Sequence, residues 1–259
     1  MEVSSVGGTS VGRRRTCAIG LLAWLGAATV RAAEPAALRM ETIQSEPFGR
    51  MGPQGPGGLM YDIGLLIALR AGLVVENHVV PYARTVLSLH NGTSDLVLRF
   101  SNDELKAVAH QVAPVLALPT VVVSRREAPL LRLQELSQRS LAVPRSFPLP
   151  ESLAGLHLQS VNSNEHAIQM LMSRRVDAAY GSNLGLFGAA RGLGLRMQAF
   201  ARPLVVERQT FWLHLSRRSA TPALIERLAQ AVASLHQDGS INRLYRRALA
   251  EFGDDRMPA

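Results

Sequence analysis

Strand-like and helix-like segments alternate along most of this chain, and this alternation restricts the possible folds more than any other feature. Residues 38–43 read as a strand, and residues 61–71 carry apolar side chains at helical spacing. Gly72 ends that helix before a second strand at 73–80. The segment DLVLRF, residues 95–100, is almost continuously apolar, as in strands buried on both faces of a parallel sheet. The pattern predicts an α/β fold with parallel strands.

Glycine and proline mark where these segments break. Residues 46–58, EPFGRMGPQGPGG, carry too many breakers for a helix or a strand. Ala113-Pro114 is expected to separate a short helix starting at Asp103 from a long β-branched strand. Asp238-Gly239 is expected to divide the tail, residues 221–252, into two helices.

A second unit repeats this alternation with its own apolar segments. The expected helices are LRLQELSQ (131–138), one after LPESLAG (149–155), and NEHAIQMLMSRR (164–175). The expected strands are SLAVPRS (140–146), LHLQSVN (156–162), VDAAYGS (176–182), LRMQAFARP (195–203) and RQTFWLHLS (208–216). Two α/β lobes joined by extended crossings near 119–124 and 203–210 fit this order. Lobe 1 would comprise residues 33–120 and 205–259, and lobe 2 residues 121–204.

The N-terminus has the pattern of a secretory signal peptide. Three arginines at 13–15 precede an apolar run at 16–30, and small residues surround Ala32. We expect cleavage after residue 32 and a periplasmic mature protein. Sec export is favoured over twin-arginine export, because the residues after the arginines do not complete the twin-arginine signal.

Composition excludes several classes of function. Residues 33–259 would contain no cysteine, which excludes disulfides and thiol chemistry there. The seven histidines lack the spacing of metal ligands. The formal net charge is +8, but the basic residues are scattered and form no stripe interleaved with aromatic residues. We therefore expect no cofactor, no metal and no nucleic-acid partner.

Five segments, taken in order, resemble the family 3 solute-binding proteins, which are the receptors of polar amino-acid ABC transporters. They are GGLMYDIGLLIALRAGL (57–73), PYARTVLSLHNGTSDLV (81–97), Ala113-Pro114, LMSRRVDAAYGS (171–182) and LHQDGSINRLYRRAL (235–249). The resemblance covers nearly all of the mature chain. It implies a two-lobed Venus-flytrap fold of the periplasmic-binding-protein type II, with a small ligand held between the lobes. Without the family, a ligand is also expected outside the carboxyl ends of the strands.

The family's two amino-acid anchors are missing at the matching positions. In the family, an arginine clamps the ligand carboxylate and an acid takes the ligand ammonium. These positions fall on Leu105 and on Gly181-Ser182 in this sequence. The resemblance therefore implies a ligand other than a standard amino acid, and we expect an anionic or neutral polar metabolite.

Candidate ligand contacts are mainly polar and aromatic residues at the ends of strands. Arg99 interrupts an apolar strand, so its charge must be paired or lie at the open end. A structural ion pair for Arg99 and a plain surface position for Arg84 stay open as alternatives. The resemblance implies a stacking role for Phe48 and an anion-binding loop at 145–146. The full set is Phe48, Tyr82, Arg84, Arg99, Ser101, Asn102, Arg145, Ser146, Tyr180 and Ser182.

Three functions are compatible with this sequence. The first is a monomeric periplasmic binding protein that delivers its ligand to an ABC permease. The second is an orphan receptor that signals through a membrane sensor. The third is an enzyme similar to cyclohexadienyl dehydratases, which resemble this family. We expect no enzyme, because no pair of carboxylates is evident among the candidates.

Overall fold

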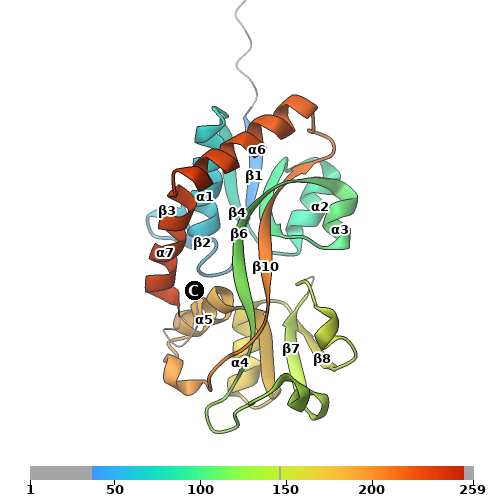
Figure 1. Ribbon diagram of the computed structural model, residues 1–259, viewed down its shortest axis with the longest axis vertical. Helices are drawn as coiled ribbons and strands as arrows, with labels where there is room; N and C mark the ends of the chain where they lie inside the picture. Colours follow the sequence, from blue (N-terminus) through green and yellow to red (C-terminus); the bar gives the residue numbers. More distant parts are fainter. Residues whose placement is uncertain (1–36, 146, 254–259) are drawn as a thin grey trace, which may run out of the picture. The chain divides into compact units, whose positions relative to one another are not determined.

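Two groups of parallel strands form one eight-stranded sheet in this computed structural model, which describes residues 37–145 and 147–253 (Figure 1). The strand order is β4-β1-β5-β10-β6-β9-β7-β8. Strand β1 pairs in parallel with β4 and β5, and β7 pairs in parallel with β8 and β9. The predicted α/β class with parallel strands is confirmed. The expected signal peptide, Ser146 and the last six residues lie outside the described residues.

The elements have the following bounds. The sheet contains β1 (Leu38–Ile43), β4 (Val75–Val80), β5 (Leu96–Phe100), β6 (Ala109–Ser124), β7 (Ser140–Pro144), β8 (His157–Val161), β9 (Ala178–Ser182) and β10 (Leu204–Ser216). The helices are α1 (Leu59–Arg70), α2 (Arg84–Asn91), α3 (Asp103–Val108), α4 (Asn164–Met172), α5 (Asn183–Gly192), α6 (Pro222–Gln237) and α7 (Ser240–Phe252). None of the helices within these described ranges is long and apolar enough to cross a membrane.

Two long strands connect the two halves of the sheet. Strands β6 and β10 run antiparallel beside each other, from Ala109 opposite Ser216 to Val122 opposite Leu204 (Figure 1). They are the predicted pair of crossing segments, so the two-lobed fold with a hinge of crossing strands is confirmed. The exact lobe limits, 33–120, 121–204 and 205–259, stay a prediction.

Pro114 does not interrupt β6, which corrects the expectation that Ala113-Pro114 breaks the chain. Pro114 pairs with Trp212, and the register of the β6–β10 ladder shifts on both sides of Trp212. A proline removes a backbone donor, and a local register shift leaves room for that loss. The strand therefore continues through the proline.

Buried apolar residues form one large cluster in the first half of the sheet, a small one there made by Leu89, Val97, Leu105 and Ala109, and two more in the second half. The first cluster packs α1, α6 and α7 against β1, β5 and β10. The two clusters of the second half cover opposite faces of β9 and β7. The division of the tail is confirmed, because α6 ends at Gln237 and α7 begins at Ser240, with Gly239 left-handed between them at φ 72°.

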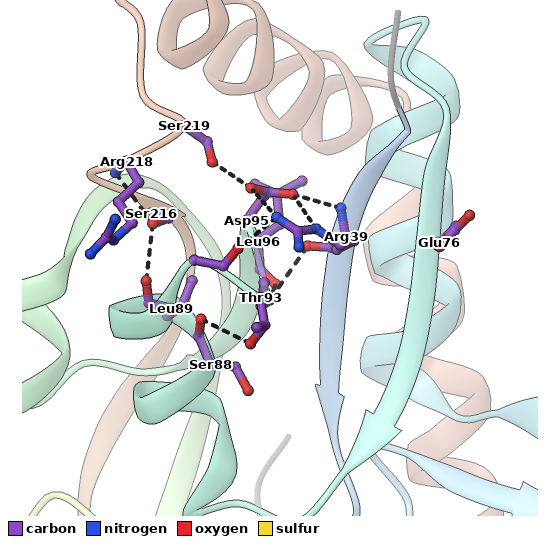
Figure 2. Close-up of polar contacts among 12 residues, drawn as sticks. Arg39, Glu76, Ser88, Leu89, Thr93, Asp95, Leu96, Ser216, Arg218 and Ser219 are labelled. Carbon is purple, nitrogen blue, oxygen red and sulfur yellow. Dashed lines mark hydrogen bonds and ion pairs between the residues drawn. The ribbon is translucent and has the colours of Figure 1, made fainter.

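Asp95 lies near the end of the segment at 81–97 that carries part of the family resemblance. It joins three parts of the first lobe (Figure 2). Its carboxylate accepts the Arg39 backbone N–H at 2.9 Å and the Arg39 Nε–H at 3.3 Å. It also accepts the Ser219 hydroxyl from the segment after β10. These hydrogen bonds and the Arg39 charge hold the pKa of Asp95 below its usual value, although burial acts in the opposite direction. Asp95 is thus a structural residue that fixes the amino end of β5.

Four local predictions are wrong. The loop after β1 contains a short hairpin, β2 (Arg50–Gly52) with β3 (Gly55–Gly57). The helix expected at 131–138 is only a 3-10 turn at Leu133–Gln138. The helix expected after residue 155 is replaced by β8, which begins at His157, and the segment before it contains a 3-10 turn at Glu151–Leu153. The expected strand at 195–203 is a 3-10 turn at Met197–Ala199. These segments are short, and tertiary contacts override weak local preferences in such cases.

Helix α5 was not predicted at all. Its sequence, NLGLFGAARG, contains three glycines, which disfavour a helix in isolation. Its first eight residues are nevertheless buried, and Ser182 caps its amino end by accepting the Gly185 N–H. Burial and capping therefore stabilise this helix where local propensity does not.

Candidate ligand-binding site

A cavity of about 580 Å³ lies where the carboxyl ends of the parallel strands meet. It is lined by the last residue of each of β1, β5, β7 and β9. The residues directly after β4 and β8 also line it. The two lobes both contribute to its lining. The lining residues are Ile43, Gln44, Ser45, Glu46, Phe48, Gly49, Arg50, Met51, Pro81, Tyr82, Phe100, Pro144, Arg145, Phe147, Asn162, Ser163, Asn164, Glu165, Ser182 and Phe211. The predicted position of a ligand at the strand ends is therefore where the cavity lies.

The loop after β1 forms one wall, and its backbone is held tightly. The Ser45 N–H donates to the Gly49 carbonyl at 3.1 Å, and the Leu59 N–H donates to the Pro47 carbonyl at 2.8 Å. Gly58 has φ 122°, and a Cβ there would lie 2.7 Å from the Phe48 carbonyl oxygen. Only glycine permits this close approach of the loop to the start of α1.

Aromatic rings form a continuous row beside the cavity. Phe211 lies between Phe48, at 5.0 Å, and Phe100, at 4.0 Å between ring centroids. Phe147, from the other lobe, packs edge-on against Phe100 at 5.2 Å and against Tyr180 at 5.5 Å. The row therefore runs from the first lobe to the second and gives the cavity an apolar side.

Ser182 and Asn164 are the two most buried polar residues of the lining, and both belong to the second lobe. Asn164 is 9% exposed, and its Nδ2 donates to Ser45 Oγ at 3.1 Å. A Cβ at Gly181 would lie 3.2 Å from Asn164 Oδ1, and one at Gly185 would lie 2.7 Å from Nδ2. The two glycines thus leave space for this amide at the place where the family has its acid.

Glu46 brings negative charge to the same region. Burial raises the pKa of Glu46, and the carboxylates of Glu251 and Glu165 raise it further, while the Arg50 guanidinium lowers it. The closest pair of atoms between Glu46 and Arg50 is Oε2 and Nη1 at 3.9 Å, which is beyond hydrogen-bond distance. The carboxylate is therefore only loosely paired.

Four of the predicted contacts line the cavity: Phe48, Tyr82, Arg145 and Ser182. Phe48 is only 2% exposed, so it also anchors the loop in the first core cluster. Arg145 is exposed, and its backbone N–H donates to the Val161 carbonyl at 2.8 Å. That these four side chains contact a ligand stays a prediction.

Arg99 is placed behind Tyr82 and is not among the lining residues. Its guanidinium carbon lies 3.9 Å from the centre of the Tyr82 ring, and its Nη1 donates to Thr85 Oγ1 at 2.6 Å. Arg99 is 0% exposed and forms no ion pair within the described part of the chain. A cation–π contact and the hydrogen bond to Thr85 thus stand where the sequence left a structural ion pair open as an alternative.

The remaining described candidates, Ser101, Asn102, Arg84 and Tyr180, are not among the residues that line the cavity. Ser101 Oγ lies 2.7 Å from His214 Nε2, and Asn102 caps α3 by accepting the Leu105 N–H at 2.9 Å. Arg84 is exposed at the start of α2. Tyr180 is fully buried and donates to Thr120 Oγ1 at 3.2 Å, and burial raises its pKa to about 12.

Sequence reasoning missed the polar residues Ser45, Glu46, Asn164 and Glu165. No pair of carboxylates was evident among the candidates chosen from the sequence, whereas Glu46 and Glu165 both line the cavity. Asn164 and Glu165 open the helix expected at 164–175, and Ser163 caps it by accepting the His166 N–H at 3.2 Å. Their position just after β8 was the signal that could have identified them.

The two-lobed sheet, the crossing strands and the cavity at the strand ends together define a solute-binding type of architecture. The model of the bacterial extracellular solute-binding proteins, family 3, matches residues 38–251. The chain belongs to this family. The comparison with curated proteins found no match.

Solved structures with the same fold include both receptors and sensors. A histidine kinase sensor domain with similarity to periplasmic binding proteins has a TM-score of 0.72 at 18% identity, covering 83% of this chain and 96% of that chain. An ancestral arginine-binding protein bound to glutamine has a TM-score of 0.70 at 18% identity, covering 85% and 100%. A solute receptor for L-cysteine of Neisseria gonorrhoeae has a TM-score of 0.70 at 17% identity, covering 86% and 93%. At these identities, the similarity shows the fold.

Proposed function

We propose that this protein is an exported periplasmic receptor that traps a small polar metabolite between its lobes. The observation that carries the proposal is the cavity of about 580 Å³, which both lobes line at the carboxyl ends of their parallel strands. A cavity of this size suits a small organic molecule. Closure about the crossing strands β6 and β10 would then cover the ligand.

Contacts across the cavity support a closing motion. Asn164 donates to Ser45, and a Cβ at Gly188 of α5 would lie 2.7 Å from the Glu46 carbonyl oxygen. These contacts join the loop after β1 to α4 and α5 of the other lobe. A ligand that bridges the same elements would favour this arrangement.

The sequence leaves an anionic or a neutral polar ligand open, and the position of the three candidate arginines bears on the anionic one. Among Arg84, Arg99 and Arg145, only Arg145 lines the cavity, and it is exposed. An exposed arginine contributes less to binding than a desolvated one. We therefore propose a polar ligand and assign its charge from the buried groups below.

The partner is proposed to be an ABC permease, which receives the ligand from the closed receptor. The sensor alternative has specific support in the similarity to a histidine kinase sensor domain. Deletion of the gene distinguishes these roles. Loss of ligand uptake would identify transport, whereas normal uptake with a lost transcriptional response would identify sensing.

The test of the receptor function is ligand-linked compaction. Protein purified after expression of the full chain would be measured by small-angle scattering and thermal denaturation with pools of amines, amino acids, organic acids and sugars. At one hundred times Kd, a ligand adds about 2.7 kcal/mol to the free energy of unfolding, which raises the midpoint by several degrees. A midpoint and radius of gyration that no pool changes would contradict the proposal. Turnover of prephenate or arogenate would favour the enzyme instead.

A further inference from the structure

The buried polar groups of the cavity lining include hydrogen-bond acceptors without donors. Asn164 is 9% exposed, and its Oδ1 has no hydrogen-bond partner within the described ranges. Its Nδ2 donates to Ser45, which orients the amide and leaves the oxygen as the free group. A buried acceptor without a donor is unfavourable, so a ligand donor at this position would be favourable.

Glu46 is a second acceptor on the lining. Its Oε2 is buried and has no hydrogen-bond partner among the residues that the structure describes. Arg50 is the nearby cation, and it also lowers the pKa of Asp62 on the other side of the loop. Arg247 also acts on Asp62, but Arg50 is the cation next to Glu46 and lies beyond hydrogen-bond distance, so the Glu46 charge is incompletely balanced.

Glu165 adds a second carboxylate from the other lobe. It is half-buried, and within the described part of the chain its side chain has neither an ion pair nor a hydrogen bond. Glu165 and Glu46 lie close enough for the Glu165 charge to raise the pKa of Glu46. Two like charges facing one cavity favour a cation between them.

We propose that the ligand is an organic amine or guanidine, whose N–H donors are received by Glu46, Asn164 and Glu165. The inference rests on the proposed function, because it takes this cavity as the ligand site. Such a ligand needs no carboxylate. The aromatic wall of Phe48, Tyr82 and Phe147 would contact its hydrocarbon part and attract its charge.

The cationic charge of the ligand follows from the lower exposure of the carboxylates, since the Glu46 side chain is 32% exposed and Glu165 is half-buried. The lining arginines are Arg50, with a side chain 47% exposed, and Arg145, which is exposed. Buried groups dominate affinity, because solvent weakens the exposed ones. A metal ion does not fit the described residues, since they contain no group of three His, Cys, Asp or Glu side chains able to hold one.

The test uses protein expressed from the full chain and isothermal titration with four probes. Putrescine and agmatine carry N–H donors, choline carries a positive charge without N–H donors, and succinate carries only negative charge. We expect putrescine or agmatine to bind at least tenfold more tightly than choline or succinate. Only the two amines can donate charge-assisted N–H hydrogen bonds to the carboxylates, and such bonds are roughly twice as strong as neutral ones.

Variants assign the binding to the named residues. Glu46→Gln and Glu165→Gln should each weaken amine binding by about tenfold or more. The matched control is Glu226→Gln, an exposed residue of α6 outside the lining, which should leave Kd unchanged. Both substitutions in the cavity keep side-chain size, so a loss of affinity would reflect charge.

The outcomes separate this inference from the proposed function. Tight succinate binding without amine binding, equal affinity for choline, or amine binding that neither variant weakens would overturn the inference. If no amine binds while another pool compacts the protein, the inference fails and the receptor function stands. If no pool compacts the protein, both fail.

Discussion

At the scale of single residues, two buried side chains behind the cavity have uncommon electrostatics. Arg99 is fully buried with Tyr82 stacked on it, and its Nε and Nη2 have no hydrogen-bond partner in the described part of the chain. His214, on the adjacent strand β10, is also fully buried. Burial, and then the Arg99 charge, lowers the pKa of His214 to about 4. The two residues therefore allow tests of charge and volume at one place in the core.

Replacement of Arg99 by methionine should change the free energy of unfolding by less than about 1.5 kcal/mol. Methionine fills a similar volume and removes the desolvation cost of an unpaired charge. Arg99→Ala should cost about 2–4 kcal/mol, because it leaves a cavity. Urea denaturation of both variants measures the difference. Equal losses would show that the polar contacts of Arg99, and not its volume, stabilise this region.

Because of His214, the free energy of unfolding should decrease as pH falls from about 6.5 to about 4. The folded-state pKa of about 4 lies below the ordinary value of 6.5, so only the unfolded chain takes up this proton in that interval. The stabilisation is complete above pH 6.5 and is lost as pH falls towards 4. Urea midpoints across this range for the parent and His214→Gln measure the effect. A variant with an unchanged pH profile would contradict this assignment.

At the scale of elements, helix α5 depends on the close approach of its glycines to the loop after β1. A Cβ at Gly188 would lie 2.7 Å from the Glu46 carbonyl oxygen and 2.9 Å from Pro47 Cδ. Gly192, at the end of the same helix, has nothing within 4 Å of such a Cβ. The two glycines therefore have different reasons to be present.

Alanine at these two positions should have opposite effects. Gly188→Ala should cost about 1–3 kcal/mol, because backbone atoms would have to move. Gly192→Ala should be neutral or stabilising by up to about 1 kcal/mol, because alanine favours a helix. Thermal and urea denaturation of the pair compare them directly. Similar losses in both variants would mean that the loop contact does not limit residue 188.

At the scale of the whole molecule, Phe147 connects the apolar clusters of the two lobes. It packs against Phe100 of the first cluster and against Tyr180 of a second. It follows β7, on the loop where the resemblance implied an anion-binding role. Its ring thus adds apolar contact between the lobes, beside the contact of α5 with the loop after β1 and the crossing strands.

Phe147→Ala should loosen the contact between the lobes more than it destabilises either one. We expect a larger radius of gyration in the ligand-free protein and a broader unfolding transition, because cooperativity between the lobes decreases. Leu149→Ala, at a neighbouring position that is 38% exposed, is the control. Small-angle scattering and urea denaturation measure both properties. If the two variants have the same radius of gyration, Phe147 does not hold the lobes together.

The sequence alone determined the α/β class, the two lobes, the crossing strands and the family. These properties depend on hydrophobic period and on motif order, which are local in sequence. DLVLRF became the buried strand β5, and Asp238-Gly239 separated α6 from α7. The three candidate residues at strand ends that line the cavity, Tyr82, Arg145 and Ser182, follow from the same rule.

Only the tertiary structure decided which polar residues share the cavity. Ser45 and Asn164 are 119 positions apart and hydrogen-bond because β1 and β8 end at the same place. Arg99 was placed correctly on its strand, but Tyr82 lies between it and the cavity side, which no local pattern predicts. Glycine-rich α5 exists because it packs against the loop at 46–48. Such contacts join residues distant in sequence, and their energies depend on packing and burial, which local preferences do not contain.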